Sequence, residues 1–483
     1  MAFAIDSQRI GAALLTVAAT AVLVWFGTGL DPLWPLFWFA PLPVLLFAAR
    51  NSGWATALTA LVAWALGGLN LEHYFAAALR VPLMGRIEIL MGPAIVLTLA
   101  VLLHRALLRR GAPWCALVAF PAVWVSFEYI LNLTSPHGTA VSLAYSQLNF
   151  LPMLQLASVT GPWGVSFLLL AFSSALALGI SLHKSAPRKA MQIVGATLAT
   201  IALVLVFGAV RLALPLPPNH DVKVGLVASD AGLNQGVAAP GAETSRLLND
   251  YASQAEFLTE RGAQVVVLPE HLGEITDLDQ ESIDAIFQPI ADRTGSTIVV
   301  GVGLESPLDP RNQARIYAPH TAVALYNKHH LLPPFESRFT PGNSLTLLPQ
   351  SSGSIWGVAI CKDMDFTQLS RQYGREGVGM MLAPGWDFVL DRISHGHMAI
   401  MRGVESGFAI ARAGRGGSLM VADNRGRILG ETDSNSAPFA TLFVDVPAVH
   451  DGTVYQLLGD WFAALNLGLL ALTLVRVFGS PVP

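Results

Sequence analysis

The sequence predicts a bundle of about eight transmembrane α-helices joined to one α/β domain. Of the 483 residues, 53% are hydrophobic and only 13% are charged, whereas about 25% of the residues in a soluble protein are charged. The charges are uneven, since residues 1–218 hold 16 of them with a net charge of +6, and residues 219–483 hold 46 with a net charge of −10. After residue 219, short β-rich runs alternate with helical stretches, which is typical of a layered α/β domain.

Seven apolar stretches in the first half reach, or nearly reach, the length of about 20 residues that a helix needs to cross a bilayer. They cover residues 10–30, 34–49, 54–69, 87–107, 114–133, 161–182 and 191–212, and an eighth covers residues 457–478. The second and third are short and could form one broken hairpin, although a polar turn at 50–53 separates them. The first is long and lacks the small-residue cleavage site of a signal peptide. We therefore expect a bundle over residues 1–218 and a C-terminal transmembrane helix within 456–483.

Basic residues predict the orientation of the bundle. With the N-terminus in the cytoplasm, nine Lys and Arg residues fall on cytoplasmic ends and loops and three on the opposite side. The nine are Arg9, Arg50, Arg105, Arg109, Arg110, Lys184, Arg188, Lys189 and Arg476; the three are Arg80, Arg86 and Arg211. The positive-inside rule then places the α/β domain outside the cytoplasm. In a Gram-negative cell this means the inner membrane, with the domain in the periplasm.

The α/β domain is expected over residues 219–455, after a stiff linker at Leu214–Asn219. Strands are predicted at 222–228, 264–268, 297–301, 322–326, 355–360 and 380–382, and helices at 242–261, 282–294, 366–376 and 392–412. A net charge of −4 and basic runs of at most two residues argue against nucleic-acid binding. The two cysteines cannot form a disulfide framework and lack metal-finger spacing.

Three segments place reactive side chains just after predicted strands, where open α/β sheets hold their sites. One ends at Glu270, the next supplies Lys328 and Glu336, and the third supplies Cys361. A thiol is mostly protonated at neutral pH, so it needs a base or a positive neighbour to attack an acyl carbon. Glu270 can take that proton. Lys328 can stabilise the thiolate and the oxyanion, together with a backbone N–H just after the cysteine.

The contexts LPE, YNKHHL and AICKD, in this order, resemble the Glu-Lys-Cys triad of the nitrilase superfamily of carbon–nitrogen hydrolases. With the bundle before the domain and one helix after it, the whole chain resembles the apolipoprotein N-acyltransferase family. The resemblance implies a nitrilase-like αββα sandwich, with Glu270 as base, Lys328 as oxyanion-side cation and Cys361 as nucleophile. It also implies a supporting role for Glu336 and for Asp363, two residues after the cysteine.

The same resemblance implies the substrates. A fatty acyl chain would pass from a phospholipid, phosphatidylethanolamine, to the cysteine as a thioester. It would then pass to the N-terminal amine of diacylglyceryl-cysteine in an apolipoprotein. Moving an acyl chain into water costs about 0.8 kcal/mol per CH₂, so a nucleophile beside membrane lipids suits this donor. No cofactor is expected.

Alternatives stay open at several positions. Glu336 could form a structural salt bridge. Asp363 could either accept hydrogen bonds from groups around the site or cap the helix that follows it. Trp386, near the aromatic that follows the next strand in the family, and His330 are candidates for the substrate pocket. We expect no metal site, because the histidine pairs at 329/330 and 395/397 lack the spacing of helical zinc sites.

The chain departs from the family pattern in loops expected to shape the acceptor side. Lys362 follows the cysteine where the family has Tyr, Pro334-Phe335 replaces Phe-Gly, and Gly414 lies in a motif that lacks its usual Asn. A second hypothesis is therefore a membrane-anchored amidase of the nitrilase type that hydrolyses small C–N bonds. A third is a structural membrane protein with a degenerate nitrilase domain.

Overall fold

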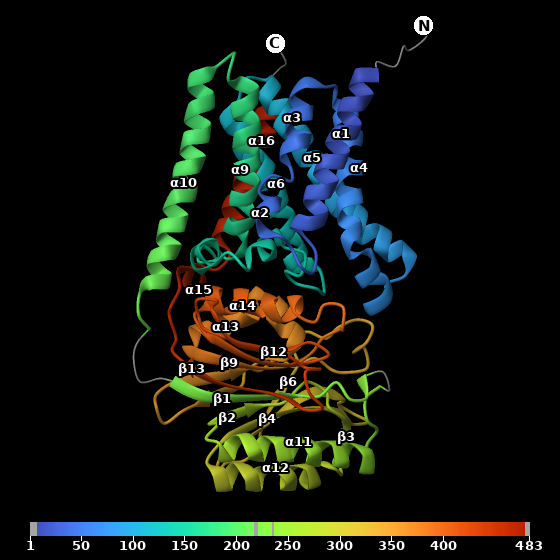
Figure 1. Cartoon of the computed structure of the whole chain (residues 1–483), viewed down its shortest axis with the longest axis vertical. Coiled ribbons are helices and arrows are strands. Elements are labelled where there is room, and N and C mark those ends of the chain that lie inside the picture. The colour runs from blue at the N-terminus through green and yellow to red at the C-terminus, as the bar shows by residue number, and fades with distance from the viewer. Residues whose placement is uncertain (1–6, 217–220, 234–235, 479–483) are drawn as a thin grey trace. The chain divides into compact units, whose positions relative to one another are not determined.

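The computed structural model describes residues 7–216, 221–233 and 236–478 and divides into two compact units (Figure 1). The helical unit comprises the chain up to Leu133, Val141–Ala213 and the chain from Leu458. The α/β unit comprises Thr134–Ala140 and Leu214–Leu457. Positions 217–219 of the predicted linker lie outside the described residues.

The helical unit contains every apolar stretch that the sequence predicts. Its main helices are α1 (Ser7–Gly27), α2 (Trp34–Phe37), α3 (Leu42–Arg50), α4 (Gly53–Gly68), α5 (Leu83–Arg109), α6 (Pro113–Thr134), α9 (Pro162–Leu182), α10 (Pro187–Ala213) and α16 (Trp461–Phe478). Short elements connect them: 3-10 turns at Leu69–Leu71 and Leu143–Gln147, a π-helix at Tyr74–Ala78, α7 (Leu151–Leu154) and α8 (Ala157–Thr160). Within the described residues, seven helices are long and apolar enough to cross a membrane. The chain is thus a multi-pass membrane protein.

The predicted helix at 34–49 differs from the other seven because it is broken into α2 and α3. Pro41 occupies the N-cap of α3 and Pro43 lies in its first turn. Proline lacks the N–H that a continuous helix requires but suits a first turn. The two prolines therefore start a new helix instead of extending the first.

The described residues of the α/β unit form two sheets. The first has the order β13-β1-β2-β4-β5-β6, with β3 beside β4, and the second has the order β12-β11-β10-β9-β8-β7. Strands of the first are β1 (Asp221–Ala228), β2 (Val265–Val267), β3 (Glu274–Thr276), β4 (Thr297–Glu305), β5 (Arg311–Tyr317), β6 (Ala324–Asn327) and β13 (Ala440–Pro447). Strands of the second are β7 (Leu347–Pro349), β8 (Ile355–Val358), β9 (Val378–Trp386), β10 (Ala409–Arg415), β11 (Ser418–Ala422) and β12 (Ile428–Asp433).

Helices cover the outer face of each sheet. The first sheet packs against α11 (Ala242–Glu260) and α12 (Gln280–Thr294), and the second against α13 (Thr367–Arg375) and α14 (Ser394–Ser406). Strands β1 and β4 of the first sheet face β10 and β9 of the second, and α15 (Val454–Leu458) follows the last strand. The four layers, visible in Figure 1, confirm the predicted αββα sandwich.

Strand direction brings the predicted site residues to common edges. Strand β2 is parallel to β4, and two antiparallel steps through β5 make β6 run the same way. Glu270 and Lys328, which follow β2 and β6, therefore emerge at the same edge of the first sheet. In the second sheet β8 and β9 are also parallel, so Cys361 follows β8 at the edge where β9 ends in Trp386.

One predicted helix is too long. The stretch 392–412 is helical only to Ser406, because Gly407 adopts a φ of +77° and ends α14 in a left-handed cap. A Cβ on Gly407 would lie 2.0 Å from the carbonyl oxygen of Asp451. The chain then enters β10 at Ala409.

Candidate active site

Two carboxylates bind the ammonium group of Lys328, and one amide joins the two carboxylates. Its Nζ lies 2.7 Å from Oε1 of Glu270 and 2.9–3.0 Å from the two oxygens of Glu336. Asn312, on β5, donates from Nδ2 to Glu270 over 2.7 Å and also to Glu336. The backbone N–H of Leu332 donates to Glu336 over 2.6 Å. The structure thus brings three predicted residues into one hydrogen-bonded cluster.

Burial and charge determine how this cluster titrates. Burial raises the pKa of the Glu270 carboxyl above its ordinary value, although Lys328 opposes the rise. Burial alone would lower the pKa of Lys328, but the charges of Glu270 and Glu336 raise it well above its ordinary value. Burial also acts to raise the pKa of Glu336, and Lys328 reverses that effect so that it is lowered. Of the two carboxyls beside Lys328, Glu270 is therefore the one better suited to accept a proton.

Cys361 lies on a sharp turn between β8 and a 3-10 segment, Cys361–Asp365. Its φ of +46° is unusual for a residue with a side chain, and nucleophiles of α/β hydrolases also occupy a strained strand-to-helix turn. Its Sγ lies 3.5 Å from the carbonyl oxygen of Trp386 and 3.9 Å from both Nδ1 of His395 and Nη2 of Arg412. Burial and the charge of Glu270 raise the pKa of this thiol. It therefore needs a base to react.

Asp363 connects the turn that holds the cysteine to the loop that holds Lys328. Its Oδ1 accepts hydrogen bonds from the backbone N–H of His329 and from the N–H and ring Nδ1 of His330, over 2.8–3.1 Å. Its Oδ2 accepts from the hydroxyl of Tyr326 over 2.7 Å and from the N–H of Ile360 over 3.1 Å. Of the two predicted alternatives, the geometry favours hydrogen-bond acceptor for these loops over cap of α13.

The two pocket candidates occupy different surroundings. The ring of His330 stacks on Phe366 with 3.5 Å between centroids, so this side chain supports the loop that Asp363 binds. Trp386 ends β9, and the guanidinium of Arg415 lies 4.3 Å above its ring. Its carbonyl oxygen accepts from Cys361. The role of either side chain in binding substrate stays a prediction.

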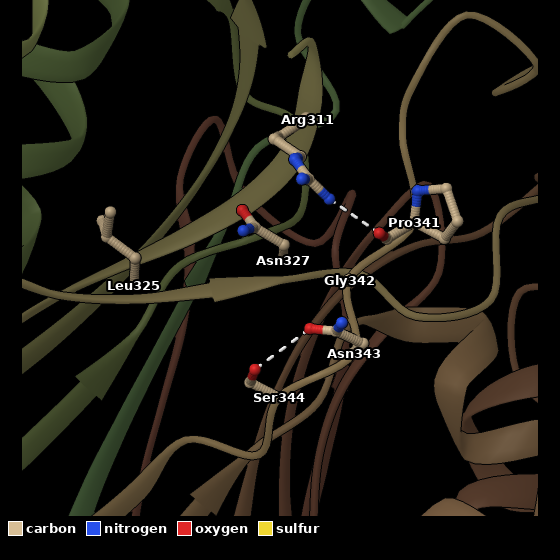
Figure 2. Close-up of a pocket in the computed structure, with 7 residues that line it drawn as sticks. All are labelled: Arg311, Leu325, Asn327, Pro341, Gly342, Asn343 and Ser344. Carbon is tan, nitrogen blue, oxygen red and sulfur yellow. Dashed lines mark hydrogen bonds between the residues drawn. The ribbon is translucent and has the colours of Figure 1, made fainter.

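A small surface pocket lies at the edge of β5 and β6 (Figure 2). Its lining residues are Arg311, Leu325, Asn327, Pro341, Gly342, Asn343 and Ser344, and its volume is about 110 Å³. The Arg311 side chain donates to the carbonyl of Pro341 over 2.6 Å. None of the predicted site residues lines this pocket, so we assign it no part in the chemistry.

Comparisons with known proteins match both units. The apolipoprotein N-acyltransferase N-terminal domain matches residues 12–175, and the carbon–nitrogen hydrolase domain matches residues 231–449. The chain belongs to the apolipoprotein N-acyltransferase family. Apolipoprotein N-acyltransferase of Geobacter metallireducens is 25% identical over 74% of each chain, and that of Haemophilus influenzae is 25% identical over 92% of this chain and 89% of its own. An amidase of the nitrilase superfamily from Nesterenkonia aligns over 52% of this chain and 99% of its own, with 22% identity and a TM-score of 0.42.

The structure shows the surroundings of two of the departures from the family pattern, Lys362 and Gly414. Lys362 is buried, with its Nζ 3.1 Å from Nδ1 of His137 and 3.8 Å from Oδ2 of Asp365. Burial lowers the pKa of Lys362. A Cβ on Gly414 would lie 2.6 Å from Oδ2 of Asp387. The space beside that carboxylate therefore admits only a glycine.

Sequence reasoning missed four site residues: Asn312, Asp387, His395 and Arg412. His395 was considered only as a metal ligand, and Arg412 begins the family motif in which only Gly414 was singled out. Asn312 lies within β5, in a run of polar residues that carries no recognisable motif. The sequence offered one signal that Asp387 belongs to the site, namely its position directly after the pocket candidate Trp386.

Proposed function

We propose that this family member transfers a fatty acyl chain from a phospholipid to the N-terminal amine of diacylglyceryl-cysteine in apolipoproteins. The observation that carries the proposal is the ion pair of Glu270 and Lys328, whose charges both act on the thiol of Cys361. This pair lies in a nitrilase-like sandwich, and the described part of the same chain contains seven membrane-length helices. The names of the relatives, apolipoprotein N-acyltransferases, support this acceptor. Phosphatidylethanolamine is the donor we infer.

The first half-reaction forms a thioester on Cys361. Glu270 takes the thiol proton, and the sulfur attacks the ester carbonyl carbon of the phospholipid. Lys328 and the backbone N–H that follows the nucleophile stabilise the oxyanion. When the intermediate collapses, the ester C–O bond breaks and the lysophospholipid alkoxide takes the proton from Glu270.

The second half-reaction transfers the chain to the acceptor amine. The neutral amine attacks the thioester carbonyl and passes a proton to Glu270. The new C–N bond forms, the C–S bond breaks, and its electron pair returns to the sulfur of Cys361. The proton on Glu270 then returns to the thiolate, so the enzyme is regenerated without a cofactor.

We infer that the helices hold both acylated substrates in lipid. Each CH₂ drawn into water would cost about 0.8 kcal/mol, and eight helical segments are more than a tether needs. The nine-to-three distribution of basic residues supports an inner-membrane location with the α/β unit in the periplasm.

The test isolates each half-reaction in purified full-length protein. The protein is incubated with phosphatidylethanolamine, and the peptide containing Cys361 is searched by mass spectrometry for a fatty acyl thioester. A diacylated lipopeptide is then added and its N-acylation is measured. Cys361→Ala should abolish the adduct, whereas Cys115→Ala, at the other cysteine, should leave it unchanged.

The rival hydrolase predicts a different result. If no acyl adduct forms and short amides are hydrolysed instead, the chain is a membrane-anchored amidase. If the adduct forms and water rather than the lipopeptide removes the acyl chain, the proposed acceptor is wrong.

A further inference from the structure

The sulfur of Cys361 has a second set of charged neighbours besides the predicted triad. His395, in the first turn of α14, and Arg412, on β10, each place a nitrogen 3.9 Å from Sγ. Both bind the same carboxylate. Oδ1 of Asp387 lies 2.9 Å from Nδ1 of His395, and Oδ2 lies 2.7 Å from Nη1 of Arg412, which also donates through Nη2 to Oδ1.

The backbone leaves room for the side chains of Asp387 and Arg412 because glycines occupy the neighbouring positions. A Cβ on Gly417 would lie 2.0 Å from Oδ2 of Asp387, and one on Gly385 would lie 2.8 Å from Nη2 of Arg412. A Cβ on Gly414 would lie 2.5 Å from Nη1 of Arg412. Three glycines thus provide the space for one ion pair, and the side chains of that pair are at most 1% exposed.

The set is positively charged around neutral pH. Burial alone would lower the pKa of His395, but Cys361 and the carboxylates of Asp365 and Asp387 raise it well above its ordinary value. Burial acts to raise the pKa of Asp387, and Arg412 and His395 reverse that effect, lowering it to about 2. Two cations therefore share one carboxylate next to the sulfur.

We propose that His395 is a further catalytic residue, an imidazolium that stabilises the Cys361 thiolate together with Arg412, while Asp387 is a positioning residue that fixes both cations. The inference rests on the proposed thioester mechanism. It assigns the thiolate partners on α14 and β10, in addition to Lys328, which follows β6.

The net charges of the two groups of residues near the sulfur favour transfer of its proton to Glu270. Before reaction, Glu270, Glu336 and Lys328 carry a net charge of −1, and Asp387, His395 and Arg412 carry +1. Moving the proton from the sulfur of Cys361 to Glu270 makes the first set neutral, and the new thiolate neutralises the second. The same balance favours thiolate as the leaving group when the amine attacks the thioester.

Other charged groups surround this set. Asp365 lies 3.4 Å from Nε2 of His395 and pairs with Lys362 at 3.8 Å. Asp391 acts electrostatically on Arg412. A shared metal ion is the competing explanation, since Cys361, Asp387 and His395 offer ligand atoms within 4.8 Å of one another. The hydrogen bonds from Arg412 to both oxygens of Asp387 argue for the ion-pair arrangement.

The experiment measures the thiolate directly, without any lipid. In full-length Cys115→Ser protein, the rate of iodoacetamide alkylation of Cys361 is recorded against pH. His395→Gln should raise the midpoint by about one pH unit or more, because an opposite charge at this distance shifts a pKa by about 1–3 units. At pH 7 the alkylation rate should fall about tenfold. The matched control is His397→Gln, on the same helix but paired with Glu431, which should leave the midpoint unchanged.

A second pair of variants covers the case in which His395→Gln fails to fold. Arg412→Met should raise the pH midpoint of alkylation. Arg412→Lys, which retains the positive charge, should leave the midpoint close to that of the parent protein. Midpoints equal to that of the parent protein in folded His395→Gln or Arg412→Met would overturn the inference. A parent protein that is alkylated only after EDTA treatment would also overturn it, in favour of a bound metal ion.

The two proposals fail separately. If the parent protein forms no acyl adduct with phosphatidylethanolamine but His395→Gln shifts the midpoint, the acyl donor is wrong and the role of His395 stands. If the adduct forms and neither set of variants shifts the midpoint, the proposed function stands and the role of His395 is wrong.

Discussion

Replacing Asp363 with Asn tests whether one carboxylate holds the site together. Its Oδ1 accepts three hydrogen bonds, from His329 and His330, and its Oδ2 accepts two, from Tyr326 and Ile360. Asparagine supplies one oxygen and one NH₂ group. The least costly orientation keeps the oxygen at the position with three donors, because the hydroxyl of Tyr326 can reverse and accept from the NH₂.

The magnitude follows from the bonds that change. The N–H of Ile360 loses its acceptor while buried, which costs about 1–3 kcal/mol. The three bonds that remain lose their ionic character, at about 1 kcal/mol each. Asp363→Asn should therefore destabilise the α/β unit by roughly 4–6 kcal/mol. For a unit of this size, about 2–4 °C per kcal/mol corresponds to a fall of roughly 10–20 °C in melting temperature.

The assay is thermal unfolding of the full chain in detergent, followed by tryptophan fluorescence. The control is Asp309→Asn, whose carboxylate is 54% exposed and pairs with Arg311 at 2.7 Å. An exposed pair contributes at most about 1 kcal/mol, so the control should melt within a few degrees of the wild type. If Asp363→Asn melts as the control does, the donors have other acceptors and the reasoning is wrong.

Three further predictions concern Asn312, Glu270 and the glycine that ends α14. Asn312→Leu should slow thioester formation at least tenfold in the mass-spectrometric assay, because two buried carboxylates lose their shared amide donor; an unchanged rate would exclude that role. Glu270 acts as a base only when ionised and its pKa is raised, so thioester formation should be lost as pH falls through a value above 4.5; a rate that is flat down to pH 4.5 would contradict this assignment. Gly407→Ala should prevent accumulation of folded protein, because it adds a backbone clash to a positive φ. Gly295→Ala, also at a positive φ but with nothing within 4 Å, should cost only about 1–2 kcal/mol, and equal effects of the two would refute the clash.

The sequence predicted the parts of the site that follow buried parallel strands. Such strands are continuous apolar runs, so the positions of Glu270 and Cys361 at their ends could be inferred. Asn312 could not, because it lies on β5, where polar and apolar residues mix and no periodicity distinguishes the strand. Nor could Asp387, since its function depends on β9 lying beside β10, and strand order is a property of the folded sheet.

The helix that was predicted too long shows the same limit. The run from 392 to 412 reads as helical by composition, yet Gly407 divides it into α14 and β10. His395 therefore lies on α14 and Arg412 on β10, yet both side chains contact the sulfur of Cys361. The local sequence pattern cannot predict that Arg412 lies beside the sulfur, because the pairing of β10 with β9 determines its position.

The short segment Thr134–Ala140 has a practical consequence for producing the α/β unit alone. This segment enters the α/β unit from α6 and leaves it again, so the chain joins the two units at four points. Thr139 donates from its N–H and its hydroxyl to the carbonyl of Asp365, over 3.0 and 2.7 Å, four residues beyond the nucleophile. A fragment cut at residues 214 and 457 would lack this segment, and its reactive turn would lose these two hydrogen bonds and the one between Lys362 and His137. Such a fragment requires residues 134–140 to be grafted back.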